Sequence, residues 1–171
     1  LTTYGEINTW DTKLITDMGG LFSGKTTFDD NINNWNLENV QSIANMFRSA
    51  HAFNQPLNNW NLSSMHNMNA LFHDARNFNQ PLNNWEFPDS TVLTQGLFSG
   101  ALAFNQDISS WNVSKFNTMS NMFKGATSFN QNISSWDMSG ITNMSDMFSG
   151  ATSFNQNISS WDGSNVTNMS N

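Results

Sequence analysis

The chain has no cysteine, so it can form no disulfide bond and offers no thiolate ligand to a metal ion. Charge is also scarce: 6 Lys and Arg stand against 13 Asp and Glu, for a formal net charge of −7. Nucleic acids and anionic membranes attract clustered Lys and Arg, so we expect neither as a partner. No apolar run is long enough to span a bilayer, and we therefore expect no direct membrane insertion of this segment.

Amide side chains are abundant where charged ones are scarce. Asn alone occurs 29 times in 171 residues, and only 37% of the residues are hydrophobic. Such polarity is typical of disordered chains, but disordered chains are poor in aromatic residues. This chain has 7 Trp and 14 Phe at regular intervals. A regular supply of large apolar side chains can form a core, so we predict that the chain folds.

The Trp residues recur every 25 residues, with a single interval of 26. An Ile or Leu precedes each Trp by three residues, and Phe recurs at two further positions of the period. Periods of roughly 20–50 residues indicate stacked repeats. We predict a single array of about seven 25-residue repeats over residues 1–171, with an atypical first repeat and an incomplete last one. The Trp positions that define the period are Trp10, Trp35, Trp60, Trp85, Trp111, Trp136 and Trp161.

The first part of each repeat predicts a short strand. In the best-formed repeat, Ile108, Trp111 and Val113 have the L-x-x-L-x-L spacing of leucine-rich repeats, with Trp in the second apolar position. Alternation across residues 111–113 places Trp and Val on the inner side of such a strand. A row of Trp side chains could instead stack on sugars, but its alternation with Asn or Asp favours a core position.

The second part of each repeat predicts a short helix. Phe116, Met119, Met122 and Phe123 follow one another at helical spacing, and Gly125 is suited to a helix end. Parallel strands joined by helical crossovers form right-handed coils. The predicted fold is therefore an α/β repeat solenoid, leucine-rich-repeat-like and right-handed, with a parallel sheet on one face and short helices on the other.

A short polar residue follows the Phe that returns each repeat to the core. Stacked amides at this position can bond the backbone of neighbouring repeats, so we predict a ladder through the stack. The interval of 26 comes from one extra residue in segment 86–90, where Pro88 predicts a bulge and a local break in the sheet. The ladder positions are Asp29, Asn54, Asn79, Asn105, Asn130 and Asn155.

The recurrent pattern W-[DN]-x-S-x-V-T-x-M-x-x-M-F, clearest in residues 129–171, resembles the BspA-like leucine-rich-repeat family of surface proteins. The resemblance extends from Tyr4 to Asn171. It implies a secreted or surface-anchored protein, in some cases an adhesin, and the family has no shared catalytic residues to carry over.

Polar residues on either side of each Trp form the candidate ligand surface, because the alternation turns them away from the core. Rows of amides, hydroxyls and carboxylates suit glycans or protein backbone, and simple solvation of an exposed face is the alternative. Asp11, Asp137 and Asp162 could bind Ca²⁺, but they lie in separate repeats; ice binding would need Thr arrays that are absent. The candidate residues are Asn34, Asn36, Asn59, Asn61, Asn84, Glu86, Ser110, Asn112, Ser135, Asp137, Ser160 and Asp162.

Seven N-x-S/T sequons are glycosylation candidates in a eukaryotic secretory source, although many such triplets arise by chance in an Asn- and Ser-rich repeat. They begin at Asn61, Asn112, Asn132, Asn143, Asn157, Asn165 and Asn168.

No catalytic or cofactor constellation stands out. His51, His66 and His73 fall at unrelated places in their repeats, and nothing resembles a nucleophile, base and acid set, so we predict neither an enzyme, a metal site nor a cofactor. The predicted function is a non-enzymatic extracellular or cell-surface module that binds a protein or glycan ligand through the polar sheet face, for adhesion. The alternative is a structural building block of an extracellular fibre, sheath or coat, whose partners are copies of itself.

Overall fold

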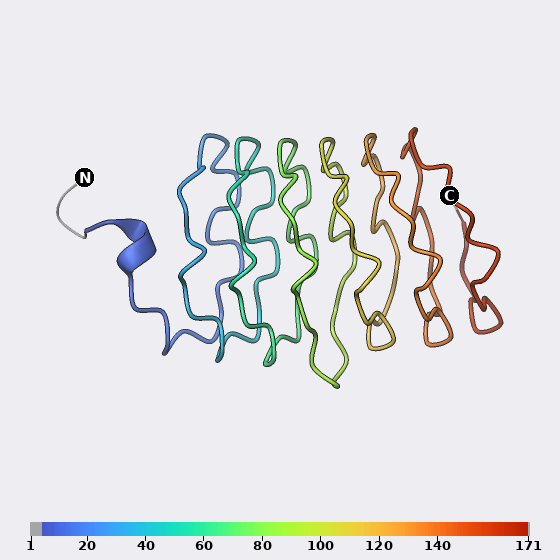
Figure 1. Ribbon diagram of the computed structural model, residues 1–171, viewed down its shortest axis with the longest axis horizontal. Coiled ribbons are helices and arrows are strands. Elements are labelled where there is room, and N and C mark those ends of the chain that lie inside the picture. The colour runs from blue at the N-terminus through green and yellow to red at the C-terminus, as the bar shows by residue number, and fades with distance from the viewer. Residues whose placement is uncertain (1–4, 171) are drawn as a thin grey trace.

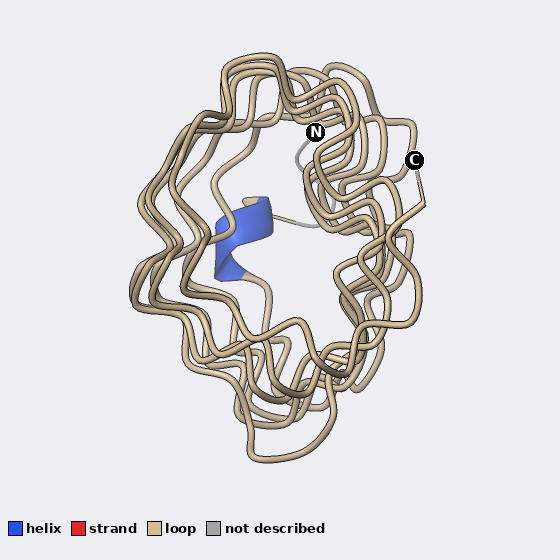
Figure 2. Cartoon of the chain, turned by 90° about the vertical axis from the view of Figure 1, so that its right-hand side faces the viewer, coloured by secondary structure: helices blue, strands red, loops and turns tan. Residues whose placement is uncertain are grey.

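The computed structural model describes residues 5–170, in which the repeats form successive coils of the chain that lie side by side (Figure 1). Viewed along the stack, the traces of the coils run nearly parallel around a common interior (Figure 2). Within the described residues, no helix is long and apolar enough to cross a membrane.

Regular secondary structure is almost absent from these coils. Residues 5–170 contain one helix, the 3₁₀ helix η1 (Ile7–Thr9), and β-pairing is limited to isolated parallel bridges such as the one between Ser42 and Asn67. The predicted α/β leucine-rich-repeat-like solenoid, with a parallel sheet on one face and short helices on the other, is therefore wrong. The expected right-handed crossover depended on those strands and helices, so its basis is lost as well.

The segment predicted as a helix instead bonds one coil to the next. Over residues 119–126, alternate backbone N–H groups donate to the following coil, as from Met119 to Asn143 O and from Phe123 to Met147 O, both at 2.9 Å. The intervening N–H groups close tight turns within the coil, as from Met122 to Met119 O at 3.1 Å. An α-helix would direct each of these N–H groups to the carbonyl four residues earlier. The two bonding patterns exclude each other.

Left-handed backbone angles at two positions of this segment also exclude a helix. Asn121 has a φ of 57° and Gly125 a φ of 68°, and Asn45 and Ser49 take the same two positions in an earlier coil. An α-helix requires φ near −60° throughout, whereas Gly and Asn tolerate the left-handed region. Gly125, predicted to end a helix, is thus one element of a recurring chain of turns.

The segment predicted as a strand uses side chains to join the coils. The Trp111 N–H closes a turn onto Ile108 O at 3.1 Å, and its indole Nε1 donates to Leu82 O of the preceding coil at 2.9 Å. The same indole bond, between 2.8 and 3.3 Å, recurs from Trp35 to Trp161. A ring N–H explains why Trp occupies this apolar position, since Leu could fill the space but could not donate.

The core consists of aromatic and Met side chains stacked from coil to coil. The five Trp residues from Trp35 to Trp136 are each 3% exposed, which confirms their predicted core position. Two Phe rows run beside them: Phe98 lies 3.9 Å from Phe104 in its own coil and 5.8 Å from Phe123 in the next, measured between ring centroids. Each coil therefore buries its apolar side chains against one another and against those of the neighbouring coils.

The predicted polar ladder is confirmed. The backbone N–H of Asn130 donates to Asn105 Oδ1 at 2.9 Å, and the N–H of Asn105 donates to Asn79 Oδ1 at the same distance. From the second step on, the Gln that follows reinforces the ladder, as Gln131 Nε2 donates to both Asn105 O and Asn105 Oδ1. The ladder begins at Asp29 and ends at Asn155, and the N–H to Oδ1 distance at each of its steps is 2.8 or 2.9 Å.

The extra residue at 86–90 lengthens one loop, which reaches furthest at the lower edge of Figure 1, in yellow-green. Because no sheet is present, the predicted break in a sheet does not arise. The coil-to-coil offset grows from 24 residues to 25 there, as Met68 N donates to Leu93 O at 2.8 Å. Half-buried Phe87 packs edge-on against Trp111 and Phe116, with ring centroids 5.2 and 4.9 Å apart. The polar ladder continues across this coil, because the Asn105 N–H donates to Asn79 Oδ1 at 2.9 Å.

Candidate ligand surfaces

The twelve candidate residues beside the Trp positions form two exposed rows along the stack, which we call the polar edge. All twelve are exposed, one residue before and one after each Trp from Trp35 to Trp161, of which the first five are buried and Trp161 is half-buried. The rows arise from Trp packing and tight turns, and no sheet face is involved. The polar edge comprises Asn34, Asn36, Asn59, Asn61, Asn84, Glu86, Ser110, Asn112, Ser135, Asp137, Ser160 and Asp162.

The row that follows the Trp residues shapes the backbone. Asn61 Oδ1 accepts the N–H of Ser63 at 2.9 Å, and Asp137 Oδ1 accepts that of Ser139 at 3.0 Å. Such Asx turns occupy one oxygen of each side chain and leave the amide nitrogen or the second carboxylate oxygen available. In this row, therefore, one side-chain oxygen holds the backbone turn, and the remaining polar atom of the same side chain is available to a ligand.

The row that precedes the Trp residues changes character along the stack. In the C-terminal half its hydroxyls bond the previous coil, as Ser135 Oγ donates to Ser109 O at 3.0 Å and Ser160 Oγ to Ser134 O at 2.8 Å. In the N-terminal half of this row, within residues 5–170, the side chains of Asn34 and Asn59 form no hydrogen bond, and neither does that of Glu86, which belongs to the row that follows the Trp residues. Free polar groups are thus concentrated in the Asn-rich half.

Shallow hollows lie along the polar edge. One of about 300 Å³ is lined by Asn34, Asn36, Asn59 and Asn61, and the next, of about 370 Å³, by Asn59, Asn61, Asn84 and Glu86 beside Phe87. The two hollows share Asn59 and Asn61. A third, of about 320 Å³, lies in the Ser-rich half between residues 132 and 160.

The sequons have a structural origin in six of seven cases. Asn132 Oδ1 accepts the N–H of Ser134 at 3.0 Å, and Asn157 Oδ1 accepts that of Ser159, so the Asn and Ser of the triplet are the two ends of an Asx turn. Asn61, Asn112, Asn143 and Asn168 make the same turn. Asn165 differs, because its Nδ2 donates to Ser139 O of the previous coil at 2.7 Å.

Asp137 and Asp162 of the polar edge are part of the same turns. The Ser139 hydroxyl and N–H lower the pKa of Asp137, and the Ser164 N–H and hydroxyl lower the pKa of Asp162. Asp11 pairs with Lys13 at 3.2 Å. Within residues 5–170, no three or more His, Asp or Glu side chains lie close enough together to hold a metal ion.

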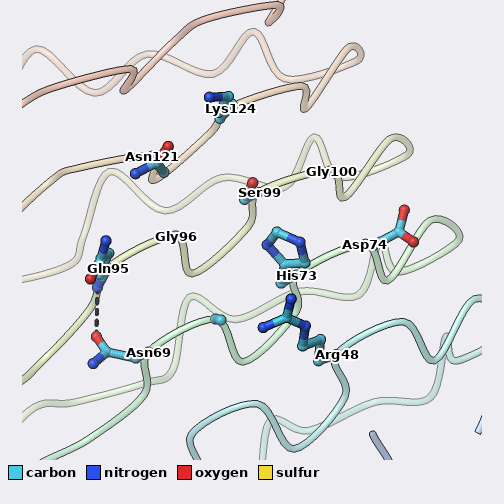
Figure 3. A pocket seen from close by; sticks show the side chains of 11 residues that line it. Arg48, Asn69, His73, Asp74, Gln95, Gly96, Ser99, Gly100, Asn121 and Lys124 are labelled. Carbon is cyan, nitrogen blue, oxygen red and sulfur yellow. Dashed lines mark hydrogen bonds between the residues drawn. The ribbon is translucent and has the colours of Figure 1, made fainter. Parts of the chain in front are cut away.

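A larger hollow, of about 560 Å³, lies on the face formed by the turn segments, and sequence reasoning missed it (Figure 3). Gly96 and Gly100 form its floor, because both left-handed positions of that coil lack a side chain. Residues 96–100 have the sequence Gly-Leu-Phe-Ser-Gly. Among the corresponding turn segments of the other coils, only residues 20–24 have the same sequence. That motif was the signal available in the sequence. We call this hollow the glycine hollow; its lining includes Arg48, His73, Asp74, Ser99 and Lys124.

Ionic contacts surround the glycine hollow. Asp74 bonds Arg76 Nε at 2.9 Å and His51 Nε2 at 3.0 Å, and the Arg76 hydrogen bond is the main reason that the pKa of Asp74 is lowered. Burial and then the nearby Arg48 lower the pKa of His73, against the opposing charge of Asp74. A lowered pKa favours the neutral imidazole at neutral pH. Both His51 and His73 are half-buried.

Comparison with known proteins places the whole chain in one repeat family. No curated protein and no solved structure matches the chain. One family model matches twice, over residues 2–95 and 90–171, which together span almost the full length. The two matches overlap by a few residues and follow the repeats described above. The chain belongs to the family described as Mycoplasma protein of unknown function, DUF285.

Proposed function

We propose that this chain is a non-enzymatic binding module of the cell exterior, which recognises a protein or glycan ligand through the polar edge. The observation that carries the proposal is the division of the polar side chains into two groups. Most bond the next coil or close a turn, whereas Asn34, Asn59 and Glu86 bond nothing within residues 5–170 and line adjoining hollows. The resemblance to BspA-like surface proteins supports the extracellular location.

The shape of the surface favours an extended ligand. Hollows of about 300 and 370 Å³ are shallow and polar, and no apolar anchor pocket adjoins them except beside Phe87. Affinity would come from many modest hydrogen bonds spread over the Asn-rich half, as in polar, water-rich interfaces. A glycan or an extended peptide segment offers hydrogen-bond donors and acceptors in alternation along its length, and could therefore contact several of these Asn side chains at once.

Binding to glycan and matrix-protein arrays tests the proposal. The double variant Asn59→Arg with Asn84→Arg places two bulky cations in the hollows, and we expect at least a tenfold loss of signal for the ligand found with the wild type. Thr127→Arg with Thr152→Arg is the matched control, because both residues are exposed and Arg76 occupies their position in another coil. Thermal melting verifies that both variants fold.

The outcomes are distinct. Loss in the polar-edge variant alone supports the proposal, whereas equal loss in both variants, or retained binding in the first, would place the ligand elsewhere. Self-assembly into a fibre, sheath or coat remains the alternative prediction. Light scattering that shows a monomer at high concentration, together with array binding, would count against it.

A further inference from the structure

The glycine hollow contains a hydroxyl that forms no hydrogen bond to the protein. Ser99 is 7% exposed as a residue, and its Oγ forms no hydrogen bond within residues 5–170. Among the described residues, the only buried side-chain N or O atom without a partner is Asn58 Oδ1, so the Ser99 hydroxyl is not sealed off and can be reached from the hollow that Ser99 lines. Ser99 lies between the two glycines that form the floor, on the same face as His73 and Lys124 (Figure 3). A ligand atom in the hollow would satisfy this hydroxyl.

Cationic groups gather around the same hollow, although the chain is acidic. Arg48 and Lys124 line it and Arg76 lies beside Asp74, so three of the six Lys and Arg residues are found here. The carboxylate of Asp74 is already engaged by Arg76 and His51. Lys124 Nζ pairs with Asp146 Oδ1 at 3.3 Å, and an ammonium group has two further donors beyond that contact. Arg48 makes only one long hydrogen bond, of 3.4 Å to Asn45 Oδ1, which leaves most of its guanidinium donors available.

The rest of the lining offers amide groups from three coils. Asn69, Gln95 and Asn121 surround the hollow, and Asn69 Oδ1 already accepts the backbone N–H of Gln95 at 2.8 Å. The volume of about 560 Å³ falls within the roughly 300–1,000 Å³ typical of small-molecule sites. Guanidinium, ammonium and hydroxyl donors around this hollow suit a hydroxylated ligand with one anionic group.

We propose that the glycine hollow binds a small, hydroxylated anion such as an acidic sugar, with Arg48 and Lys124 contacting the anionic group and Ser99 donating from the floor. This site is separate from the polar edge and does not depend on the function proposed for that edge. The anionic group could be a carboxylate or a sulfate, and the probes below distinguish the two.

Titration of the ¹⁵N-labelled protein, followed by amide chemical shifts, tests the proposal with defined probes. Glucuronate and N-acetylglucosamine 6-sulfate carry the two anionic groups, and glucose is the neutral control. We expect saturable shifts at Gly96, Ser99 and Gly100 with at least one acidic probe and none with glucose. Replacing Arg48 and Lys124 by Gln should weaken binding about tenfold or more, since each change removes a charged donor.

Two further variants keep the proposal falsifiable. Lys13→Gln with Lys115→Gln removes the same charge elsewhere and should leave binding unchanged. Gly96→Asn should fill the hollow and abolish binding without unfolding the chain, because Asn121 and Asn45 take the same backbone angle at the equivalent position. Absence of saturable shifts with both acidic probes at millimolar concentration, or equal binding by the Gly96→Asn variant, would overturn the proposal.

Discussion

Replacement of Asn105 by Ala removes one step of the polar ladder without disturbing the core. The side chain is exposed, and its Oδ1 accepts two hydrogen bonds, from Asn130 N–H at 2.9 Å and from Gln131 Nε2 at 3.0 Å. Gln131 keeps its second acceptor, Asn105 O, at 2.9 Å. The half-buried N–H of Asn130 loses its partner altogether.

The cost follows from these contacts. A protein hydrogen bond contributes about 0.5–1.5 kcal/mol net, so losing one fully and one partly should cost about 1–2 kcal/mol. For a chain of this size, about 1 kcal/mol shifts the melting temperature by roughly 2–4 °C. We therefore expect the Asn105→Ala variant to melt roughly 2–8 °C below the wild type. The Asn130 amide should also exchange its hydrogen faster.

The matched control is Asn105→Asp. Asp29 already occupies the first ladder position, where its Oδ1 accepts the N–H of Asn54 at 2.8 Å. The Asp variant should therefore retain nearly the full stability of the wild type at neutral pH. Calorimetry measures the stability, and amide exchange by NMR locates the effect. An Ala variant as stable as the wild type, with unchanged exchange at Asn130, would refute the ladder as a source of stability.

Three other changes test other parts of the fold. Trp85→Phe removes the 3.0 Å hydrogen bond from Nε1 to Leu57 O and leaves a small cavity at a position that is 3% exposed. Urea denaturation should therefore show a decrease of about 2–3 kcal/mol in the free energy of unfolding. A decrease below about 0.5 kcal/mol would contradict the role of the indole N–H. Gly100→Ala should destabilise the fold more than Gly24→Ala. Both glycines have positive φ, but a Cβ at residue 100 would lie 3.3 Å from backbone atoms of Asp74, whereas a Cβ at residue 24 would have no atom within 4 Å. Equal melting temperatures of the two variants would count against this packing. The lowered pKa values of Asp137 and Asp162 mean that the folded chain binds fewer protons than the unfolded chain in acid, so their contribution to stability is present above pH 3.8 and is lost as the pH falls through the folded pKa. The double variant Asp137→Asn with Asp162→Asn should therefore lose less melting temperature than the wild type on acidification. An unchanged dependence of melting temperature on pH would argue against this role.

The sequence predicted which residues are buried better than it predicted their backbone. The period, the core positions of Trp35 to Trp136 and the polar ladder all follow from side-chain character repeated at fixed spacing. The backbone did not follow, because apolar spacing at Met119, Met122 and Phe123 fits both a helix and a chain of tight turns. Only the residues between them, such as Asn121 and Gly125 with positive φ, distinguish the two.

For the candidate sites too, exposure could be predicted from the sequence, whereas the contacts of the side chains could not. Exposure of the polar edge was predictable, since every member adjoins a Trp that is buried or half-buried. The engagement of Asn61 and Asp137 in turns was not predicted, although Asn or Asp followed two residues later by Ser is typical of Asx turns. The glycine hollow was missed because it exists only where neighbouring coils place Arg48, Ser99 and Lys124 together. Residues in different repeats meet only once the register between coils is known.

The bonding between coils can be observed directly by NMR. Scalar couplings across hydrogen bonds connect the amide nitrogen of a donor to the carbonyl carbon of its acceptor, so they identify partners without reference to secondary structure. We predict a coupling from the Phe123 amide to the Met147 carbonyl of the next coil, where the N···O distance is 2.9 Å. A coupling from Phe123 to Met119, four residues earlier in the same coil, would instead show a helix and contradict the fold described above.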